Sequence, residues 1–221
     1  MTTATCDITH PKAQEYAEAH STPEQPPLRE LNRWAHLNTA QPRMMAGAYQ
    51  GRLLQMLSQM VRPHRAVELG SYVGYSTVCL AQGLADDGVL HAIEADEECE
   101  DIIRHALAAA RVGEKVRLHI GPALEVIPTI DERYDLAFID ADKRNTPRYY
   151  DMLVPRMNIG GFIVIDNVLW SGKVLSDVSA SDKDTLLFCE FNDYVQHDRR
   201  VENLLLPIRD GLMLARVVSR S

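Results

Sequence analysis

Two short apolar runs of this chain end abruptly in polar, oxygen-bearing residues. One run ends at Asp140, and a later run ends at Asp166 and Asn167. Because ligands of an α/β sheet bind at the carboxyl ends of its parallel strands, two neighbouring strand ends would bring these three side chains together. Two carboxylates and an amide are hard oxygen ligands that suit Mg²⁺ or Ca²⁺ better than zinc. With Lys143 beside them, they predict a site of metal-assisted chemistry.

A glycine-bearing loop, Gly70 to Gly74, lies between a predicted strand that contains Glu68 and a predicted helix. Its glycines let a ligand approach the backbone closely, and the start of the helix offers free N–H groups. The Gly-x-x-x-Gly spacing lacks the fingerprint that places a pyrophosphate on the helix, which argues against an NAD-dependent oxidoreductase. Glu94 ends the next predicted strand, about where a carboxylate accepts hydrogen bonds from ribose hydroxyls. Together they favour a ribose-bearing cofactor without a pyrophosphate, of which S-adenosylmethionine is the obvious example.

Strand and helix patterns alternate from residue 65 to the end of the chain. The predicted strands are 66–69, 89–94, 116–120, 134–140, 162–166, 201–207 and 211–218, and the predicted helices are 75–84, 97–110, 122–130, 148–157 and 183–196. Gly160-Gly161 should turn into the fifth strand, and a polar loop should follow that strand. This alternation predicts an α/β fold with a doubly wound, Rossmann-like, mostly parallel seven-stranded sheet. Asp210-Gly211 is a strong turn signal, so the last two strands should form a C-terminal antiparallel hairpin.

The first 64 residues show helical patterns interrupted by prolines. A polar helix is followed by a second that begins at the break Ser21–Glu24, and a third runs from about Gly47 to Val61. Ser or Thr in that break would cap the second helix, with proline in its first turn. We expect a single domain over residues 1–221, in which an N-terminal helical cap (1–64) precedes the cofactor- and metal-binding α/β core (65–221).

Composition and charge exclude several classes of protein. The 221 residues are 46% hydrophobic and 24% charged, with a net charge of -8. No long Lys/Arg run suggests nucleic-acid binding, and no apolar run approaches the ~18 residues of a membrane span. Met1 to Lys12 lacks the apolar core of a signal peptide. The four cysteines form no Cys-x-x-Cys pair, which favours a reducing cytoplasm over a zinc site or a disulfide framework.

Five motifs occur in an order that resembles a known family. They are Val67-Glu68-Leu69-Gly70-Ser71-Tyr72-Val73-Gly74-Tyr75-Ser76-Thr77, Gly121-Pro122-Ala123, Phe138-Ile139-Asp140-Ala141-Asp142-Lys143, Asp166-Asn167-Val168-Leu169-Trp170-Ser171-Gly172-Lys173-Val174 and Leu206-Pro207-Ile208-Arg209-Asp210-Gly211-Leu212. Over about residues 24 to 218 the chain resembles the cation-dependent O-methyltransferases of the caffeoyl-CoA and catechol O-methyltransferase type.

The resemblance implies a role for each matching residue. The S-adenosylmethionine contacts would come from Ala46, Glu68, Gly70, Ser71, Ser76, Glu94, Ala123 and Asp140. The divalent cation, Mg²⁺ or else Ca²⁺ or Mn²⁺, would be bound by Asp140, Asp166 and Asn167. The acceptor would face Asp142, Trp170 and Ser171, with Lys143 as the general base. Members of this family are commonly cytosolic homodimers, so we expect the same here.

The chain departs from the family pattern at two positions. Thr146, followed by Pro147, stands where a tyrosine often follows the Asp-Ala-Asp-Lys motif, and Ala46 replaces a threonine of the plant members. Neither change removes a metal ligand, but the first alters the wall on the acceptor side. The net charge and the lack of an obvious basic cluster for a CoA phosphate favour a small catechol or dihydroxylated natural product over a CoA ester.

The expected reaction is methyl transfer to one hydroxyl of a vicinal diphenol. A phenol has a pKa near ~10 and is mostly protonated at neutral pH. A cation that coordinates two vicinal oxygens lowers this pKa and fixes the position of the oxygen that attacks the sulfonium methyl. Lys143 can accept the proton only in its neutral form.

Other interpretations compete with this one. Asp140-Ala141-Asp142 also matches the Asp-x-Asp pattern of metal-dependent glycosyltransferases, although the Gly70–Gly74 loop argues against a nucleotide-sugar site. A non-catalytic S-adenosylmethionine-binding module would be indicated by a broken metal set or a lost lysine, and both are intact. Single residues have alternatives of their own: a helix cap for Asp140, a surface pairing with Asp142 for Lys143, and core packing for Trp170.

Overall fold

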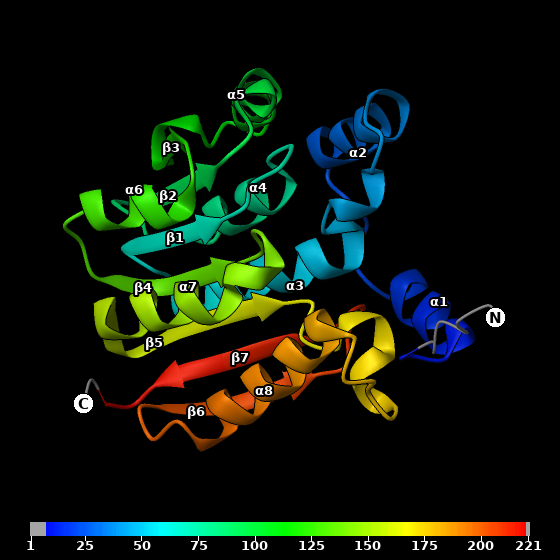
Figure 1. The fold of residues 1–221 in the computed structure, drawn as a ribbon. Coiled ribbons are helices and arrows are strands. Elements are labelled where there is room, and N and C mark those ends of the chain that lie inside the picture. Colours follow the sequence, from blue (N-terminus) through cyan, green and yellow to red (C-terminus); the bar gives the residue numbers. More distant parts are fainter. Residues whose placement is uncertain (1–7, 220–221) are drawn as a thin grey trace. The chain divides into compact units, whose positions relative to one another are not determined.

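The computed structural model describes residues 8–219 (Figure 1), so Cys6 lies outside the described part of the chain. These residues divide into two compact units. One is Ser21–Ala137, and the other combines the residues up to His20 with those from Phe138 onward. Within residues 8–219, no helix has both the length and the apolar character needed to cross a bilayer.

Seven strands form one mixed sheet in the order β3-β2-β1-β4-β5-β7-β6. The strands are β1 Arg65–Leu69, β2 Val89–Glu94, β3 Val116–Ile120, β4 Tyr134–Ile139, β5 Met157–Asp166, β6 Val201–Leu206 and β7 Leu212–Val217. The predicted seven-stranded Rossmann-like sheet with a C-terminal antiparallel hairpin is therefore confirmed.

The unit Ser21–Ala137 holds the parallel strands β1, β2 and β3, in which β2 pairs with both of the others. Its α-helices are α2 Pro26–Asn38, α3 Gly47–Val61, α4 Tyr75–Ala81, α5 Glu100–Ala109 and α6 Ala123–Val126. Its 3-10 helices are η1 Pro42–Met44, η2 Glu97–Cys99, η3 Gly113–Lys115 and η4 Ile127–Thr129. Strand β1 is buried from Ala66 to Leu69 and every residue of α4 is buried, as expected of a parallel sheet that is covered by helices.

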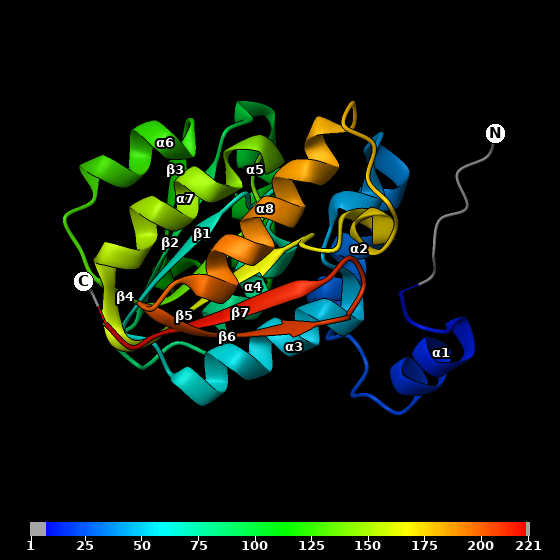
Figure 2. The ribbon, with the colours of Figure 1, turned by 60° about the horizontal axis from the view of Figure 1, so that its bottom comes forward.

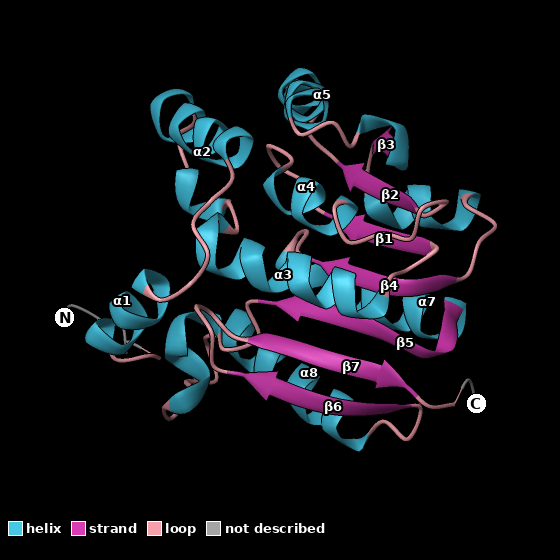
Figure 3. Ribbon diagram, turned by 180° about the vertical axis from the view of Figure 1, so that it is seen from behind, coloured by secondary structure: helices cyan, strands magenta, loops and turns pink. Residues whose placement is uncertain are grey.

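The other unit holds the antiparallel strands β5, β7 and β6 (Figure 3). Its α-helices are α1 Pro11–Ala19, α7 Thr146–Leu153 and α8 Lys183–His197, and its 3-10 helices are η5 Lys143–Asn145, η6 Val154–Arg156 and η7 Trp170–Leu175. Helix α8 contacts β6 (Figure 2), and its buried residues include Phe188, Phe191 and Val195. Helix α8 also contacts η7, where Phe188 stacks on Trp170.

Three local predictions were wrong. Helix α2 begins at Pro26 after Gln25, and not at the break Ser21–Glu24, because the pair Pro26-Pro27 occupies the first-turn positions that tolerate proline. Strand β5 begins at Met157 and not after a Gly160-Gly161 turn, since Gly160 adopts a φ of 89° inside the strand without ending it. The segment after Asn167 is not wholly the predicted polar loop, because Trp170–Leu175 is a 3-10 helix with a kink.

The predicted hairpin between β6 and β7 is confirmed, with Gly211 at a φ of 85°. A Cβ atom at Gly211 would lie 2.5 Å from Leu169 Cγ. The backbone N–H of Leu169 also donates a hydrogen bond to the carbonyl of Asp210 at 2.9 Å. The tip of the hairpin is thus packed closely on the segment that follows β5.

Candidate active site

Glu68, the fourth residue of β1, is completely buried. Its Oε2 accepts hydrogen bonds from the hydroxyls of Ser71 at 3.1 Å and Thr77 at 2.5 Å. Oε1 accepts no hydrogen bond of good geometry from residues 8–219, although the nearby Ser76 hydroxyl favours the charged form. Burial outweighs these hydroxyls and raises the pKa of the Glu68 carboxyl from 4.5 to about 7. Glu68 is therefore a carboxyl whose charge would be stabilised by a cationic ligand.

The loop after β1 has the left-handed backbone that its glycines permit. Gly70 and Gly74 have φ values of 89° and 87°, and Tyr72 between them has a φ of 49°. The Gly74 N–H donates to the Ser71 carbonyl at 2.7 Å, which closes the loop into a tight turn. A Cβ at Gly74 would lie 3.3 Å from Ile103 Cα, so this position has both a steric and a conformational need for glycine.

The carboxylate of Glu94, at the end of β2, ties this loop to the turn that follows β2. Oε2 accepts a hydrogen bond from the Tyr72 backbone N–H at 2.6 Å, and Oε1 accepts one from the Asp96 backbone N–H at 2.9 Å. Sequence reasoning assigned Glu94 to the ribose of the cofactor, and this remains a prediction. The structure adds that Glu94 also orders the backbone around it.

The other predicted cofactor residues of this unit lie at the starts of helices. Ala46 directly precedes α3, Ser76 is in the first turn of α4, and Ala123 begins α6. All three are buried, with no more than 6% exposed. Their small side chains suit a surface that a planar ligand approaches closely, and their contacts with a cofactor remain a prediction.

Asp140 and Lys143 form an ion pair. Lys143 Nζ lies 2.5 Å from Asp140 Oδ1, and the two side chains are 27% and 15% exposed. The alternative pairing of Lys143 with Asp142 is therefore wrong. The structure thus holds the predicted base against a predicted cation ligand.

Asp166 is the last residue of β5, and Asn167 follows it. Asp166 is buried, and its Oδ1 accepts a hydrogen bond from the Asn167 backbone N–H at 2.7 Å. The Asn167 side-chain amide donates through Nδ2 to Asp210 Oδ2 at 3.0 Å. Asp140 directly follows β4 and Asp166 is the last residue of β5, and these two strands are neighbours in the sheet order.

These oxygens fit a hard divalent cation in their chemistry. Asp140 and Asp166 supply carboxylates, and Asn167, whose Nδ2 is committed to Asp210, has its amide oxygen left for a ligand. Within residues 8–219, no three His, Cys, Asp or Glu side chains gather as a metal-binding group, and the predicted set itself contains only two carboxylates. The cation site therefore remains a prediction that rests on the donor set.

Asp142 has the capping role that we considered for Asp140. It is the N-cap of η5, and its Oδ1 accepts hydrogen bonds from the backbone N–H and the side-chain Nδ2 of Asn145, at 3.3 and 2.7 Å. Its Oδ2 accepts a hydrogen bond from the hydroxyl of Tyr149 on α7. Burial and this bond raise the pKa of the Tyr149 phenol, so the phenol stays a donor. The side chain of Asp142 is consequently held in place by residues of η5 and α7.

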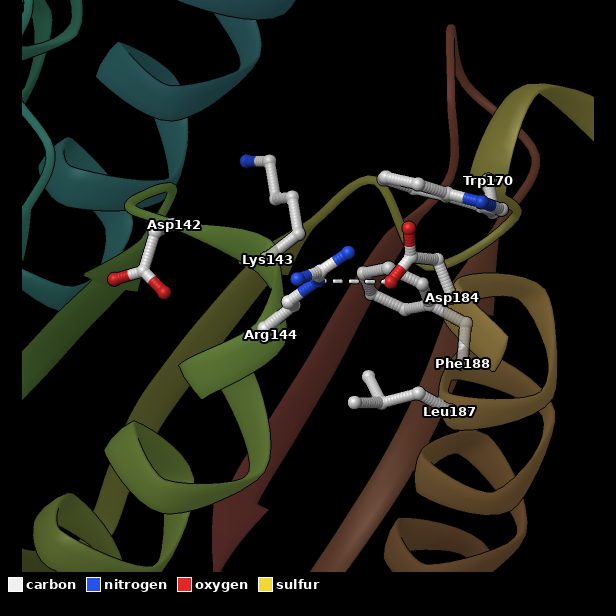
Figure 4. Close-up of a pocket in the computed structure, with 7 residues that line it drawn as sticks. All are labelled: Asp142, Lys143, Arg144, Trp170, Asp184, Leu187 and Phe188. Atoms are coloured by element: carbon white, nitrogen blue, oxygen red, sulfur yellow. Dashed lines mark hydrogen bonds and ion pairs between the residues drawn. The ribbon is translucent and has the colours of Figure 1, made fainter. Parts of the chain in front are cut away.

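A pocket of about 300 Å³ opens beside Lys143 (Figure 4). Its lining residues are Asp142, Lys143, Arg144, Trp170, Asp184, Leu187 and Phe188. The rings of Trp170 and Phe188 are stacked with centroids 4.8 Å apart, and Arg144 Nε donates to Asp184 Oδ1 at 3.0 Å. Trp170 therefore both packs on the core residue Phe188 and borders the pocket, so the two interpretations of Trp170 are compatible.

Sequence reasoning missed the contribution of α8 and of two supporting residues. Asp184, Leu187 and Phe188 recur at helical spacing, but nothing local to them indicated that this face of α8 lines a pocket. Tyr149 was missed for the same reason. Asp210 lay inside a quoted motif and was interpreted as a turn residue alone, although Ser171, a predicted acceptor contact, donates its backbone N–H to Asp210 Oδ1.

Comparisons with known proteins agree with the motif resemblance. A sequence model of the family described as "O-methyltransferase" matches residues 18–218. A caffeoyl-CoA O-methyltransferase from Mesembryanthemum crystallinum is 34% identical over 187 residues, which cover 80% of this chain and 74% of the relative.

Two solved structures are also similar. The O-methyltransferase TomG from Streptomyces achromogenes, involved in tomaymycin synthesis and solved in complex with SAM, is 27% identical with a TM-score of 0.84, over 94% of this chain and 96% of TomG. An O-methyltransferase from Bacillus cereus in complex with SAH is 29% identical with a TM-score of 0.82, over 93% of this chain and 97% of that protein.

Proposed function

This chain belongs to the O-methyltransferase family, and from that premise we propose that it methylates one hydroxyl of an aromatic vicinal diol, with S-adenosylmethionine as donor and a divalent cation as cofactor. The observation that carries the proposal is the Lys143–Asp140 ion pair beside a pocket bordered by the stacked Trp170 and Phe188. The residue proposed as proton acceptor thus contacts the residue proposed as oxygen ligand, and an aromatic surface borders the same pocket.

S-adenosylmethionine is supported by the charge pattern of the unit Ser21–Ala137. The donor carries a positive sulfonium and a positive ammonium group, and Glu68 and Glu94 supply carboxyls at the ends of β1 and β2. The relatives solved with SAM and SAH support the same assignment. A cationic ligand would also offset the cost of ionising the buried Glu68.

Asp140, Asp166 and Asn167 would hold the cation, which when bound would polarise the diol hydroxyls and help to orient them. Lys143, in its neutral form, would take the proton from the attacking hydroxyl at Nζ. The hydroxyl oxygen would form a bond to the methyl carbon as the bond from that carbon to the sulfonium sulfur breaks. Asp142, Trp170 and Ser171 would orient the acceptor, because alignment supplies much of the rate in such a transfer.

The pocket favours a small, neutral aromatic acceptor. The guanidinium group of Arg144 lines the pocket beside Lys143. It donates a hydrogen bond to the Asp184 carboxylate, which partly offsets its positive charge. With a net charge of -8, the chain offers little to attract the phosphates of a CoA ester. The glycosyltransferase alternative is disfavoured by the family membership.

A panel of vicinal diols with labelled methyl donor, assayed with Mg²⁺ and with excess chelator, tests the proposal. We expect transfer to catechols, loss of transfer in chelator, and little transfer to matched monophenols. Asp140→Ala should nearly abolish transfer while S-adenosylhomocysteine binding, measured by calorimetry, stays largely intact. Lys143→Met should lower kcat by roughly 10²-fold or more. Full activity in excess chelator would contradict the cation requirement.

We also propose that the protein is a cytoplasmic homodimer, as is common in the resembling family. Light scattering coupled to gel filtration at assay concentrations measures the assembly. A monomer that is fully active would exclude the dimer as the functional form.

A further inference from the structure

We propose that Asp210, at the tip of the β6–β7 hairpin, is a positioning residue that determines which atom of the Asn167 amide is offered to the cation. The inference rests on the proposed function, because it concerns a predicted ligand of the cation. It assigns to a turn residue a role in metal binding that its place in the sequence does not suggest.

The contacts of Asp210 are directed at the segment after β5. Oδ2 accepts a hydrogen bond from Asn167 Nδ2 at 3.0 Å, and Oδ1 accepts one from the backbone N–H of Ser171. Two backbone hydrogen bonds fasten the same segment to the hairpin: Leu169 N–H to the Asp210 carbonyl at 2.9 Å, and Val168 N–H to the Gly211 carbonyl at 3.3 Å. Each oxygen of the carboxylate thus has a donor of its own.

The segment that Asp210 holds has an unfavourable backbone. Asn167, Trp170 and Ser171 have φ values of 64°, 48° and 54°, in the left-handed region that side chains disfavour. Such residues persist only where their surroundings hold them. The two side-chain hydrogen bonds of Asp210 fall at both ends of this segment, which is where such support is needed.

The chemistry of the contact fixes the orientation of the amide. An ionised carboxylate only accepts hydrogen bonds, whereas an asparagine amide has a donating NH₂ and an accepting oxygen. Asn167 must therefore turn Nδ2 toward Asp210, and its oxygen is left for a cation. Without Asp210 the amide could rotate by half a turn and offer hydrogen atoms to the cation in place of a lone pair.

Asp210→Asn tests this with an almost unchanged shape. The introduced amide can accept from the Ser171 N–H only by placing its own NH₂ against the NH₂ of Asn167, which forces Asn167 to rotate; the reverse orientation loses the Ser171 contact. We expect Mn²⁺ affinity of the full-length protein, followed by the electron paramagnetic resonance of free Mn²⁺, to fall by about 10- to 100-fold. S-adenosylhomocysteine affinity should stay unchanged.

The exchange of both residues supplies the decisive arm. The double variant combines Asn167→Asp with Asp210→Asn. The amide now at position 210 donates to the carboxylate now at position 167 and accepts from the Ser171 N–H. Both contacts are therefore restored, and the hydrogen bond between positions 167 and 210 has its direction reversed. The introduced carboxylate then offers its second oxygen to the cation. We expect this double variant to bind Mn²⁺ at least about tenfold more tightly than Asp210→Asn. Glu202→Gln is the matched control, because it removes an exposed carboxylate of the same hairpin that pairs with Arg216.

The outcomes separate the two proposals. Unchanged Mn²⁺ affinity in Asp210→Asn, or a lower melting temperature without an effect on Mn²⁺, would overturn the positioning role while leaving the cation site intact. Unchanged Mn²⁺ affinity in Asn167→Ala would contradict Asn167 as a cation ligand, a part of the proposed function itself. A double variant no better than Asp210→Asn would show that restoring the contact between positions 167 and 210 does not restore cation binding.

Discussion

The hydroxyl of Thr77 donates a 2.5 Å hydrogen bond to the carboxyl of Glu68, which has no exposed surface. Thr77 lies on α4 and Glu68 on β1, so this bond joins the two elements that flank the glycine-bearing loop. Burial raises the pKa of Glu68 to about 7 in spite of this bond. The carboxyl group that contacts this loop therefore has a pKa close to neutral pH.

Glu68→Gln should change how stability depends on pH. In the wild type the unfolded chain releases the Glu68 proton near pH 4.5 and the folded protein near pH 7, so stability falls as pH rises between these values. The shift corresponds to roughly 3 kcal/mol. Urea unfolding at several pH values measures this. Relative to the wild type, the free energy of unfolding of the variant should rise by up to this amount as the pH is raised to 8.

Thr77→Val is the companion variant, because it removes a donor to the charged form of Glu68. As the pH rises, the free energy of unfolding of Thr77→Val should continue to fall up to a higher pH than that of the wild type. Parallel stability curves for the wild type and Glu68→Gln would refute the raised pKa.

Glu94→Gln should loosen the cofactor loop. Glutamine keeps one acceptor oxygen but places an NH₂ against either the Tyr72 or the Asp96 backbone N–H, each of which now donates to Glu94. We expect a loss of about 1–3 kcal/mol in the free energy of unfolding and weaker binding of S-adenosylhomocysteine, both measurable by calorimetry. Glu97→Gln, an exposed acid three residues away, should change neither quantity.

Gly83→Ala should destabilise the packing of α3 on α4. The added Cβ would lie 2.4 Å from Ser58 Cβ and 2.5 Å from the backbone N of Gln59, so backbone atoms would have to move. We expect a loss of about 1–3 kcal/mol, measured by chemical denaturation. At Gly113 the nearest atom would be 4.0 Å away, and Gly113→Ala should be neutral or slightly stabilising. Equal effects of the two substitutions would argue against the close approach at Gly83.

Leu187→Ala should raise the KM for the acceptor more than it lowers stability. Leu187 lines the pocket and is only partly buried, so truncation enlarges the pocket without leaving a closed cavity. We expect KM to rise about fivefold to thirtyfold, in line with the ~1–2 kcal/mol that such a side chain contributes when partly buried. Leu186→Ala, on the same helix and likewise partly buried but outside the pocket lining, is the control; an equal rise in KM there would exclude a direct contact.

Much of the sheet was predictable from local sequence patterns. The predicted bounds of β2 and β3 agree with the structure, because each strand is a short run bounded by turn residues. The start of β5 was not predictable, because Gly160 and Gly161 read locally as a turn. Whether a glycine ends a strand or bends it depends on the backbone conformation it adopts in the fold, and here the strand continues on both sides of Gly160 at a φ of 89°.

For the candidate site, residue types and order along the chain were enough to propose the family, the donor residues and the base. Composition, glycine spacing and strand-end acids carry that information because they are properties of single residues and of short local patterns. The partners of those residues were beyond reach: that Lys143 pairs with Asp140, that Asp142 is the cap, and that Asp210 accepts from the Asn167 amide. The first two contacts join residues three positions apart, and they depend on the residue at which the 3-10 turn begins. The contact between Asp210 and Asn167 joins residues 43 positions apart, so it depends on how the hairpin packs in the folded chain.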